Sequence, residues 1–281
     1  MRNAIPFLIF PGRQRYDCKR VITRFCCFLA QVSIALVVPS IYCQIDSTSL
    51  LNQAPPSQAL VSKNKLLTPE RVQKALVHAR ESFLRGRYES AQRDVQRALE
   101  ICPHCAWAHT IQGALQLQSG NYPEAAAAFQ RAIDLDPAAG SAYLGIGVVC
   151  NIEGRFKDAL IPLDRAVQYL PGSWLLYFEI ALAHLGTGES KAGLKYLAQT
   201  RQLTGNDPRQ LSGIAYLQAI AQFELKDYEG GKQFFEEAVK CEPNGTYAAL
   251  ANKWLQRLPS RIREANAQTA ELNKSSLDRT K

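Results

Sequence analysis

Two cysteines, Cys102 and Cys105, have the spacing that most directly suggests chemistry in this chain. They stand in the stretch Cys102-Pro-His-Cys105, and cysteines separated by two residues are typical of proteins that exchange disulfides. That reaction needs a thiolate, so the surroundings must lower the pKa of the attacking thiol. The start of a helix lowers it and the end of a helix raises it. The elements that flank the cysteines therefore decide whether the chemistry is available.

A metal site could also be built here, because His109 lies one helical turn beyond Cys105. Zinc prefers four ligands of this kind, yet no second ligand pair at zinc-finger spacing follows in the sequence. Haem attachment needs Cys-x-x-Cys-His, and residue 106 is alanine. We therefore expect no metal and no cofactor. Cys150 and Cys241 fall at apolar helix positions, and we expect them to be small core residues.

The sequence around the cysteines repeats with a period of 34 residues. Glycines and prolines recur at this step, namely Gly86, Gly120, Gly154 and Gly188, and Pro103, Pro137 and Pro171. On either side of each glycine the apolar residues follow helical spacing. Each period therefore predicts two helices, with a left-handed glycine between them and a proline after the second.

Small side chains recur where the two helices of each pair would cross. They are Ala79, Gly113, Gly147, Ala181 and Ala219 on the first helix, and Ala91, Ala125, Ala159, Gly193 and Gly231 on the second. Only small side chains allow helix axes to approach to roughly 8–9 Å. We therefore expect these residues to lie at the crossings.

These features resemble the tetratricopeptide repeat, a helix–turn–helix unit of 34 residues with small residues at its eighth and twentieth positions and proline at its thirty-second. The resemblance implies an all-α superhelix of five units followed by a C-terminal capping helix. The units cover about residues 72–105, 106–139, 140–173, 174–207 and 212–245, and the capping helix covers residues 246–258.

The fourth and fifth units depart from the family pattern. Gly205 replaces the proline and Ser190 the aromatic residue in the fourth unit, and Lys226 stands where the fifth unit needs glycine. A left-handed backbone conformation at Lys226 would cost about 1–2 kcal/mol, or another type of turn would form instead. The next proline, Pro243, lies four residues beyond two periods. We expect the additional residues within 203–209, with a local irregularity or a changed superhelical pitch.

The repeat changes the interpretation of the cysteines. Pro103 occupies the proline position of the repeat, so no redox role is needed to explain it. A helix is predicted to end at Cys102, which disfavours a thiolate there, whereas Cys105 lies near the start of the next helix. A strained disulfide between Cys102 and Cys105 could form if the chain is exported. A thiol-active, disulfide-forming accessory protein is thus the alternative to a protein-binding one.

The amino-terminal 45 residues predict export. Basic residues within 13–24 precede an uncharged and mostly apolar run, residues 25–38, and Pro39 would break a helix where a cleavage segment belongs. The uncharged run extends to Ile45, so a retained membrane anchor is the alternative to a cleaved signal. We expect a protein that is exported to the periplasm or cell envelope, or one that this segment tethers to the membrane. In this respect the chain is similar to bacterial envelope proteins.

The remaining ends of the chain are polar. Residues 46–67 predict a polar linker, and residues 259–281 a charged tail that is expected to be disordered. Residues 66–251 hold 18 basic and 20 acidic side chains, so the net charge of +8 arises at the two ends. We therefore expect no nucleic-acid partner, and a membrane contact only through an uncleaved amino-terminal segment.

The resemblance also implies a binding surface. In the family, the second, fifth, ninth and twelfth positions of each first helix line the concave side of the superhelix. Carried onto this chain, they include Leu76, Arg80, Phe83, Trp107, Thr110, Leu117, Leu144, Val148, Asn151, Leu175, Phe178, Leu182, Leu185, Tyr216, Ile220 and Phe223.

Most of these positions are apolar, so the resemblance favours a scaffold that binds another protein or peptide, as an amphipathic helix or an extended apolar segment. The repeats contain no catalytic motif, since their glycines are turn residues, and no enzymatic activity is expected. The alternative is self-occlusion, in which neighbouring units or the chain's own spacer from Leu50 to Leu67 fill the groove.

Overall fold

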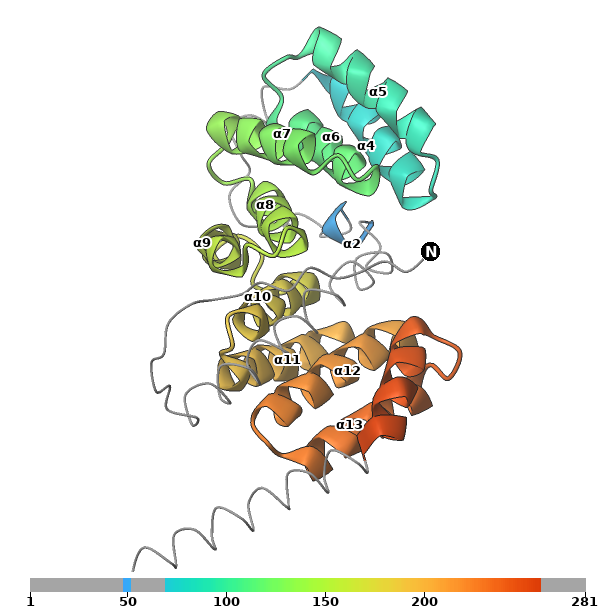
Figure 1. Cartoon of the computed structure of the whole chain (residues 1–281). Coiled ribbons are helices and arrows are strands. Elements are labelled where there is room, and N and C mark those ends of the chain that lie inside the picture. Colours follow the sequence, from blue (N-terminus) through green and yellow to red (C-terminus); the bar gives the residue numbers. More distant parts are fainter. Residues whose placement is uncertain (1–47, 52–68, 259–281) are drawn as a thin grey trace, which may run out of the picture.

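The computed structural model describes residues 48–51 and 69–258. In these two ranges every regular element is a helix and there is no strand (Figure 1). The predicted signal or anchor, all but four residues of the predicted linker, and the predicted tail lie outside the described residues. The prediction of an all-α fold is confirmed for the part of the chain that the structure describes.

The helices form five consecutive hairpins. The pairs are α4 (Glu70–Leu84) with α5 (Tyr88–Ile101), α6 (Ala106–Gln118) with α7 (Tyr122–Leu135), α8 (Gly140–Ile152) with α9 (Phe156–Val167), α10 (Trp174–Gly186) with α11 (Ser190–Thr204), and α12 (Pro208–Glu224) with α13 (Tyr228–Cys241). Residues 246–258 form a further helix, and a short helix, α2 (Thr48–Leu51), precedes the hairpins. The five predicted helix–turn–helix units and the capping helix are therefore present.

The turns within the hairpins use the left-handed backbone that the sequence predicts. Gly86, Gly120, Gly154 and Gly188 have φ angles between 69° and 82°. In the fifth hairpin Lys226 keeps the same conformation, with φ 66°, and among the described residues it is the only residue other than glycine with positive φ. The hairpin geometry thus overrides the preference of a lysine side chain.

The ten small residues predicted at the helix crossings are all buried. Their surroundings explain why nothing larger fits. A Cβ atom on Gly113 would lie 2.7 Å from the ring of Phe129, and the side chain of Leu163 fills the same place against Gly147. Each of the six alanines of the set is fully buried. Close approach of the paired helices therefore depends on these positions.

The additional residues between the fourth and fifth units lengthen a helix. The helix α12 has 17 residues, whereas α6, α8 and α10 have 13 each. It begins at Pro208, directly after the N-cap Asp207, whose side chain accepts a hydrogen bond from the main-chain N–H of Arg209. Four residues make about one helical turn, so the side chains after the added turn remain on the same sides of the helix. The predicted irregularity is present as this extra turn.

The hairpins pack against one another in sequence order and form a curved stack, with α2 on the inside of the curve (Figure 1). The buried core is divided into two clusters that meet on α10, which is apolar on almost every side and contributes to both. In the last helix the ring of Trp254 stacks on that of Phe235 at 5.8 Å between centroids. The polar side chains of Asn252, Lys253, Gln256 and Arg257 on the same helix are exposed. The helix thus closes the stack as a cap.

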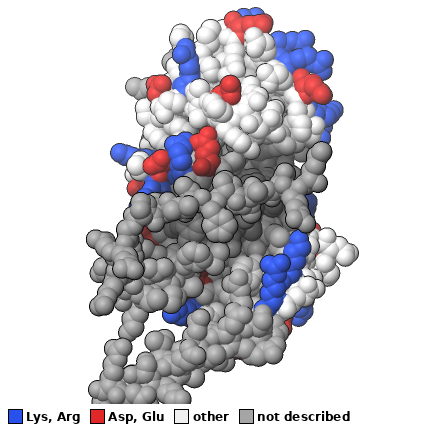
Figure 2. All heavy atoms as spheres, viewed as in Figure 1, with Lys and Arg blue, Asp and Glu red and all other residues white. Residues whose placement is uncertain are grey.

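Charged side chains of both signs are mixed on the outside of the stack. On the face seen in Figure 2, the Lys and Arg side chains of the described residues lie among Asp and Glu side chains. Local ion pairs such as Lys74–Glu70 at 2.7 Å and Arg155–Glu153 at 2.6 Å join exposed or half-exposed groups. Pairs of this kind contribute about 0–1 kcal/mol each, so apolar packing dominates the stability of the hairpins.

Polar side chains join the fourth hairpin to the fifth. The hydroxyl of Ser190 on α11 donates to the carboxylate of Glu224 on α12, and Arg201 on α11 pairs with Glu237 on α13. Burial raises the pKa of Glu224, and the hydrogen bond from Ser190 offsets part of that rise. Partial burial of the Glu224 carboxylate therefore lowers the free energy of unfolding when the group is charged.

Replacing Lys226 with glycine should stabilise the protein. Glycine adopts the left-handed conformation without the Cβ clash, although it loses more backbone entropy on folding, so we expect the free energy of unfolding to rise by about 1 kcal/mol. Gly154→Lys is the matched control, because a Cβ at Gly154 would meet nothing within 4 Å and only the backbone conformation is tested. It should lower the same quantity by a similar amount. Denaturant titration measures both changes, and a neutral or destabilising Lys226→Gly would contradict the account of this turn.

Replacing Glu224 with glutamine should change how stability depends on pH. Because the folded pKa is raised, the folded state holds its proton to higher pH than the unfolded state, so this group's contribution to stability is lost as pH rises above the usual glutamate value of about 4.3. The Gln variant has no such loss. Compared with wild type, its free energy of unfolding should therefore increase between pH 4 and pH 7. A difference that stays constant over this range would show that burial of the carboxylate is not costly.

Candidate functional site

The first helices of successive units lie next to one another along the inside of the stack. Contacts join α4 to α6, α6 to α8, α8 to α10 and α10 to α12, in addition to the contacts within each hairpin. Side chains from separate repeats therefore meet on one inner surface. This is the surface on which the sequence places the candidate binding residues.

Most of the predicted binding residues are buried in the structure. Arg80, Trp107 and Phe223 are half-buried. The other thirteen are buried, namely Leu76, Phe83, Thr110, Leu117, Leu144, Val148, Asn151, Leu175, Phe178, Leu182, Leu185, Tyr216 and Ile220. The inner surface is thus not an open apolar trough along its length, and what covers it differs from unit to unit.

Several residues at the twelfth position of a unit pack within their own hairpin. The ring of Phe83 makes an edge contact with Tyr88 at 5.4 Å between centroids, and Phe223 makes the same contact with Tyr228. The side chain of Leu185 fills the space beside Gly193 on the paired helix. These side chains hold hairpins together, so they are only partly available to a ligand.

A buried polar contact joins the third and fourth units. The side-chain amide of Asn151 on α8 donates to the main-chain oxygen of Glu179 at 3.0 Å and to its carboxylate at 2.8 Å, and both residues are fully buried. Asn151 therefore serves the stacking of α8 on α10, which its predicted place in the groove did not indicate.

Glu179 also acts on the terminal helix. Burial raises the pKa of Tyr247 on that helix, and the negative charge of Glu179 raises it further.

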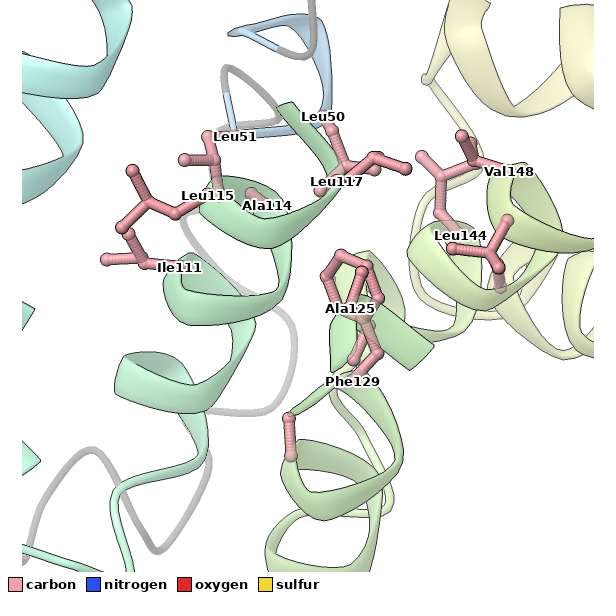
Figure 3. Packing of buried hydrophobic residues seen from close by; sticks show 14 of the residues in the cluster. Leu50, Leu51, Ile111, Ala114, Leu115, Leu117, Ala125, Phe129, Leu144 and Val148 are labelled. Carbon is pink, nitrogen blue, oxygen red and sulfur yellow. The ribbon is translucent and has the colours of Figure 1, made fainter. Parts of the chain in front are cut away.

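The short helix α2 lies on the inner surface of the first three units. It contacts α4, α6 and α8, all of which are first helices. Leu50 and Leu51 are 1% and 5% exposed and belong to the first core cluster. In Figure 3, Leu51 lies over Ala114 and Leu115 of α6, and Leu50 lies with Leu117 in the direction of Val148 on α8.

Three of the inner positions predicted by the repeat, Arg80, Leu117 and Val148, thus surround a piece of the chain's own polypeptide. We use the name α2 seat for the surface formed by Arg80, Ala114, Leu115, Leu117 and Val148. The expectation that the spacer fills the groove is met for Leu50 and Leu51, while residues 52–67 lie outside the described part. Two adjacent leucines in a polar stretch have no periodicity, so the signal for this contact in the sequence is weak.

Arg80 fixes the main chain of α2 at its end. The guanidinium Nε–H of Arg80 donates to the carbonyl oxygen of Leu51 at 2.7 Å. The last carbonyl groups of any helix have no partner within the helix, and a positive charge is favourable at that end. The contact therefore recognises the end of a short helix, whatever the side chains that the helix carries.

The forces that hold α2 are nearly balanced. Burying two leucine side chains is worth about 3–6 kcal/mol, and a hydrogen bond to a charged group adds about 1.5–3 kcal/mol. Ordering the backbone of four residues costs about 4–8 kcal/mol. Docking of α2 is therefore favourable by a few kcal/mol at most, and a competitor of moderate affinity would be able to displace it.

The described residues form neither a cluster of metal ligands nor a membrane-spanning helix. Among residues 48–51 and 69–258, no group of three or more His, Cys, Asp and Glu side chains could hold a metal ion. No helix in the same ranges is long and apolar enough to cross a membrane. His109, which the sequence places one turn from Cys105 and which could have served as a zinc ligand, bridges a turn, with Nε2 3.0 Å from the carbonyl oxygen of Pro103 and Nδ1 3.2 Å from the side chain of Gln112.

The two cysteines of the opening motif lie at opposite helix ends. The helix α5 ends at Ile101 with Cys102 as its C-cap, and Cys105 is the N-cap of α6. They are not joined as a disulfide. Burial, followed by the neighbouring Cys105, raises the pKa of the Cys102 thiol, and Cys105 is 2% exposed. Disulfide exchange requires an accessible thiol with a lowered pKa, whereas the pKa of Cys102 is raised and Cys105 is not accessible.

Alkylation by iodoacetamide should follow this description. Because only the thiolate reacts and the pKa of Cys102 is raised, its alkylation at pH 7.5 should be slower than that of a small-molecule thiol and should accelerate as pH rises through 9 and beyond. Cys105 should react more slowly still, because it is buried. Peptide mass spectrometry after timed labelling separates the two sites. A rate for either cysteine that is already maximal at pH 7 would favour the thiol-active alternative.

Comparison with known proteins agrees with the repeat architecture. The family model described as tetratricopeptide repeat matches residues 112–174. No match was found among curated proteins.

Among solved structures the chain is similar to PilF of Pseudomonas aeruginosa, with 18% identity, a TM-score of 0.57, and coverage of 73% of this chain and 91% of that one. It is also similar to TTC0263 of Thermus thermophilus, with 18% identity, a TM-score of 0.53, and coverage of 66% and 99%. A third similar structure is YrrB, described as a tetratricopeptide-repeat protein with an unusual peptide-binding site, with 20% identity, a TM-score of 0.51, and coverage of 64% and 90%. These identities speak for the fold alone. Together with the five stacked hairpins and the repeat matched at residues 112–174, they show that the described part of the chain has the tetratricopeptide-repeat fold.

Proposed function

We propose that this protein is a non-catalytic scaffold that binds a polypeptide partner through the inner surface of its first helices. The observation that carries the proposal is the α2 seat, where the array buries two leucine side chains and holds a main-chain carbonyl through Arg80. A surface that accommodates one short apolar segment of polypeptide has the chemistry to accommodate another. The inner surface thus offers apolar contacts together with a main-chain anchor.

The fold supports the same function. Tetratricopeptide arrays suggest protein–protein interaction, and the similar protein YrrB is described as having a peptide-binding site. The thiol-active alternative has no comparable support, because the pKa of Cys102 is raised and Cys105 is buried. The apolar seat, rather than the cysteines, is therefore the part of the chain to which we assign function.

The compartment follows from the amino-terminal residues alone. Their basic and then apolar layout supports a protein that is exported or tethered by this segment. In either case the array would meet its partner outside the cytoplasm, tethered by the amino-terminal segment or freed by its cleavage. This placement is part of the proposal and depends on residues outside the described ranges.

Site-specific photo-crosslinking tests the binding surface. Phe178 and Leu182 are poor probes, because they are 3% and 0% exposed in the second core cluster and a charge there would disrupt packing. Trp107 is half-buried at an inner position of α6, so p-benzoylphenylalanine can replace it with little change in shape. In cells that express the full chain, illumination should give discrete adducts that contain a second polypeptide. Gel mobility and mass spectrometry identify them.

The matched control places the same photoreactive residue at Ile161. This side chain is 73% exposed on α9, which is a second helix. Adducts should form from position 107 and be absent, or at least several-fold weaker, from position 161. Equal adducts from both positions, or adducts only from position 161, would show that the inner surface is not where a partner binds.

A further inference from the structure

The residues of α2 have the composition of a short linear ligand. Within residues 46–59, Leu50 and Leu51 are the only large apolar side chains, and polar or small residues surround them. Both are nonetheless buried, and the helix α2 that carries them contacts the first helices of three repeats. The residues around these leucines lack the periodic apolar pattern of a core helix. The fit of the two leucine side chains to the seat therefore accounts for their burial.

We propose that the α2 seat takes a short helical segment with two adjacent leucines, and that α2 occupies it as a built-in competitor of the partner. The proposal rests on the proposed function, since it names the partner's chemistry at the same surface. The partner segment inserts two leucine side chains over Ala114 and between Leu115, Leu117 and Val148. Its last helical carbonyl accepts the Nε–H of Arg80, as that of Leu51 does.

The shape of the seat accounts for this selectivity. Ala114 is fully buried and lies below Leu51 in Figure 3, where its small side chain leaves room for a leucine. A segment with a charged residue in place of either leucine would have to bury that charge among apolar side chains. A segment that continues as a helix beyond the leucines would keep its carbonyl hydrogen-bonded internally, and Arg80 would lose its acceptor.

The connection to the array sets how strongly α2 competes. Residues 52–68 join α2 to the first hairpin, and a segment tethered over this distance acts at an effective concentration on the order of millimolar. A weak partner is therefore excluded and a strong one is admitted. If α2 occupies the seat in about nine-tenths of the molecules, the apparent affinity for a competing segment falls about tenfold.

Binding of a synthetic peptide measures the seat and its occupancy. The probe is a fluorescein-labelled peptide of residues 46–56, titrated with the full chain and followed by anisotropy. Leu50→Asp combined with Leu51→Asp releases α2 without touching the hairpins. We expect the probe to bind this double variant about tenfold more tightly than wild type. A probe with aspartate in place of both leucines should bind neither protein.

A variant of the seat supplies the matched control. Adding Ala114→Phe to the double variant should weaken probe binding at least about tenfold, because the ring fills the space for Leu51. Ala127→Phe, at an exposed site on α7 of the same unit, should leave binding unchanged. Circular dichroism melts establish that each chain is folded. If Ala114→Phe prevents folding, Arg80→Ala in the double variant replaces it and should weaken binding several-fold.

Two results would overturn the inference. Equal affinity of the probe for wild type and for the double variant would show that α2 does not occlude the seat. Absence of probe binding to a folded double variant would show that the seat does not recognise the two leucines.

A second readout separates this inference from the proposed function. With the photoreactive residue at position 107, release of α2 by the double substitution should increase the yield of the partner adduct several-fold. An adduct that forms equally with and without α2 would overturn the competition while leaving the proposed function intact. Failure to form any adduct in either chain would contradict the proposed function, and the peptide titration would still decide whether the seat binds paired leucines.

Discussion

Close contact between paired helices at small residues is the constraint on which the rest of the molecule depends. Gly113 and Gly147 admit the side chains of Phe129 and Leu163 at the crossings, and the alanines at the equivalent sites are fully buried. Hairpins of one shape can stack repeatedly, and stacking brings their first helices side by side. The inner surface, the capping role of residues 246–258 and the seat of α2 all follow from that repetition.

The sequence predicts the hairpins well because their signals are local and periodic. Glycine spacing indicates the turns, the small residues indicate the crossings, and an unusual residue does not break the pattern, as Lys226 shows by keeping a left-handed backbone. The extra four residues before the fifth unit are expected within 203–209 and could not be assigned to a loop or a helix from the sequence, whereas the structure adds them as residues 208–211. They extend α12 by one turn, and one added turn leaves every later side chain on the same side of the helix.

The occupancy of the inner surface could not be predicted in the same way. A repeat position indicates the side of a helix on which a residue lies, but it does not indicate what covers that side. Phe83 packs against Tyr88 within its own hairpin, Asn151 donates a hydrogen bond to Glu179 on the next unit, and Leu117 contributes to the α2 seat. The contact of Leu50 and Leu51 with the array is nonperiodic and distant in sequence, so only the three-dimensional arrangement reveals it.

Short apolar polypeptide is the ligand that we assign to the inner surface of the first three units, with α2 as its resident occupant. Nuclear Overhauser contacts between the methyl groups of Leu51 and Ala114 in the full, methyl-labelled chain test this assignment most directly. Because Leu50 and Leu51 are buried in the first core cluster, we expect such contacts in the full chain and their loss in the chain carrying Leu50→Asp and Leu51→Asp. Random-coil methyl shifts for both leucines, with no contact to Ala114, would contradict the account.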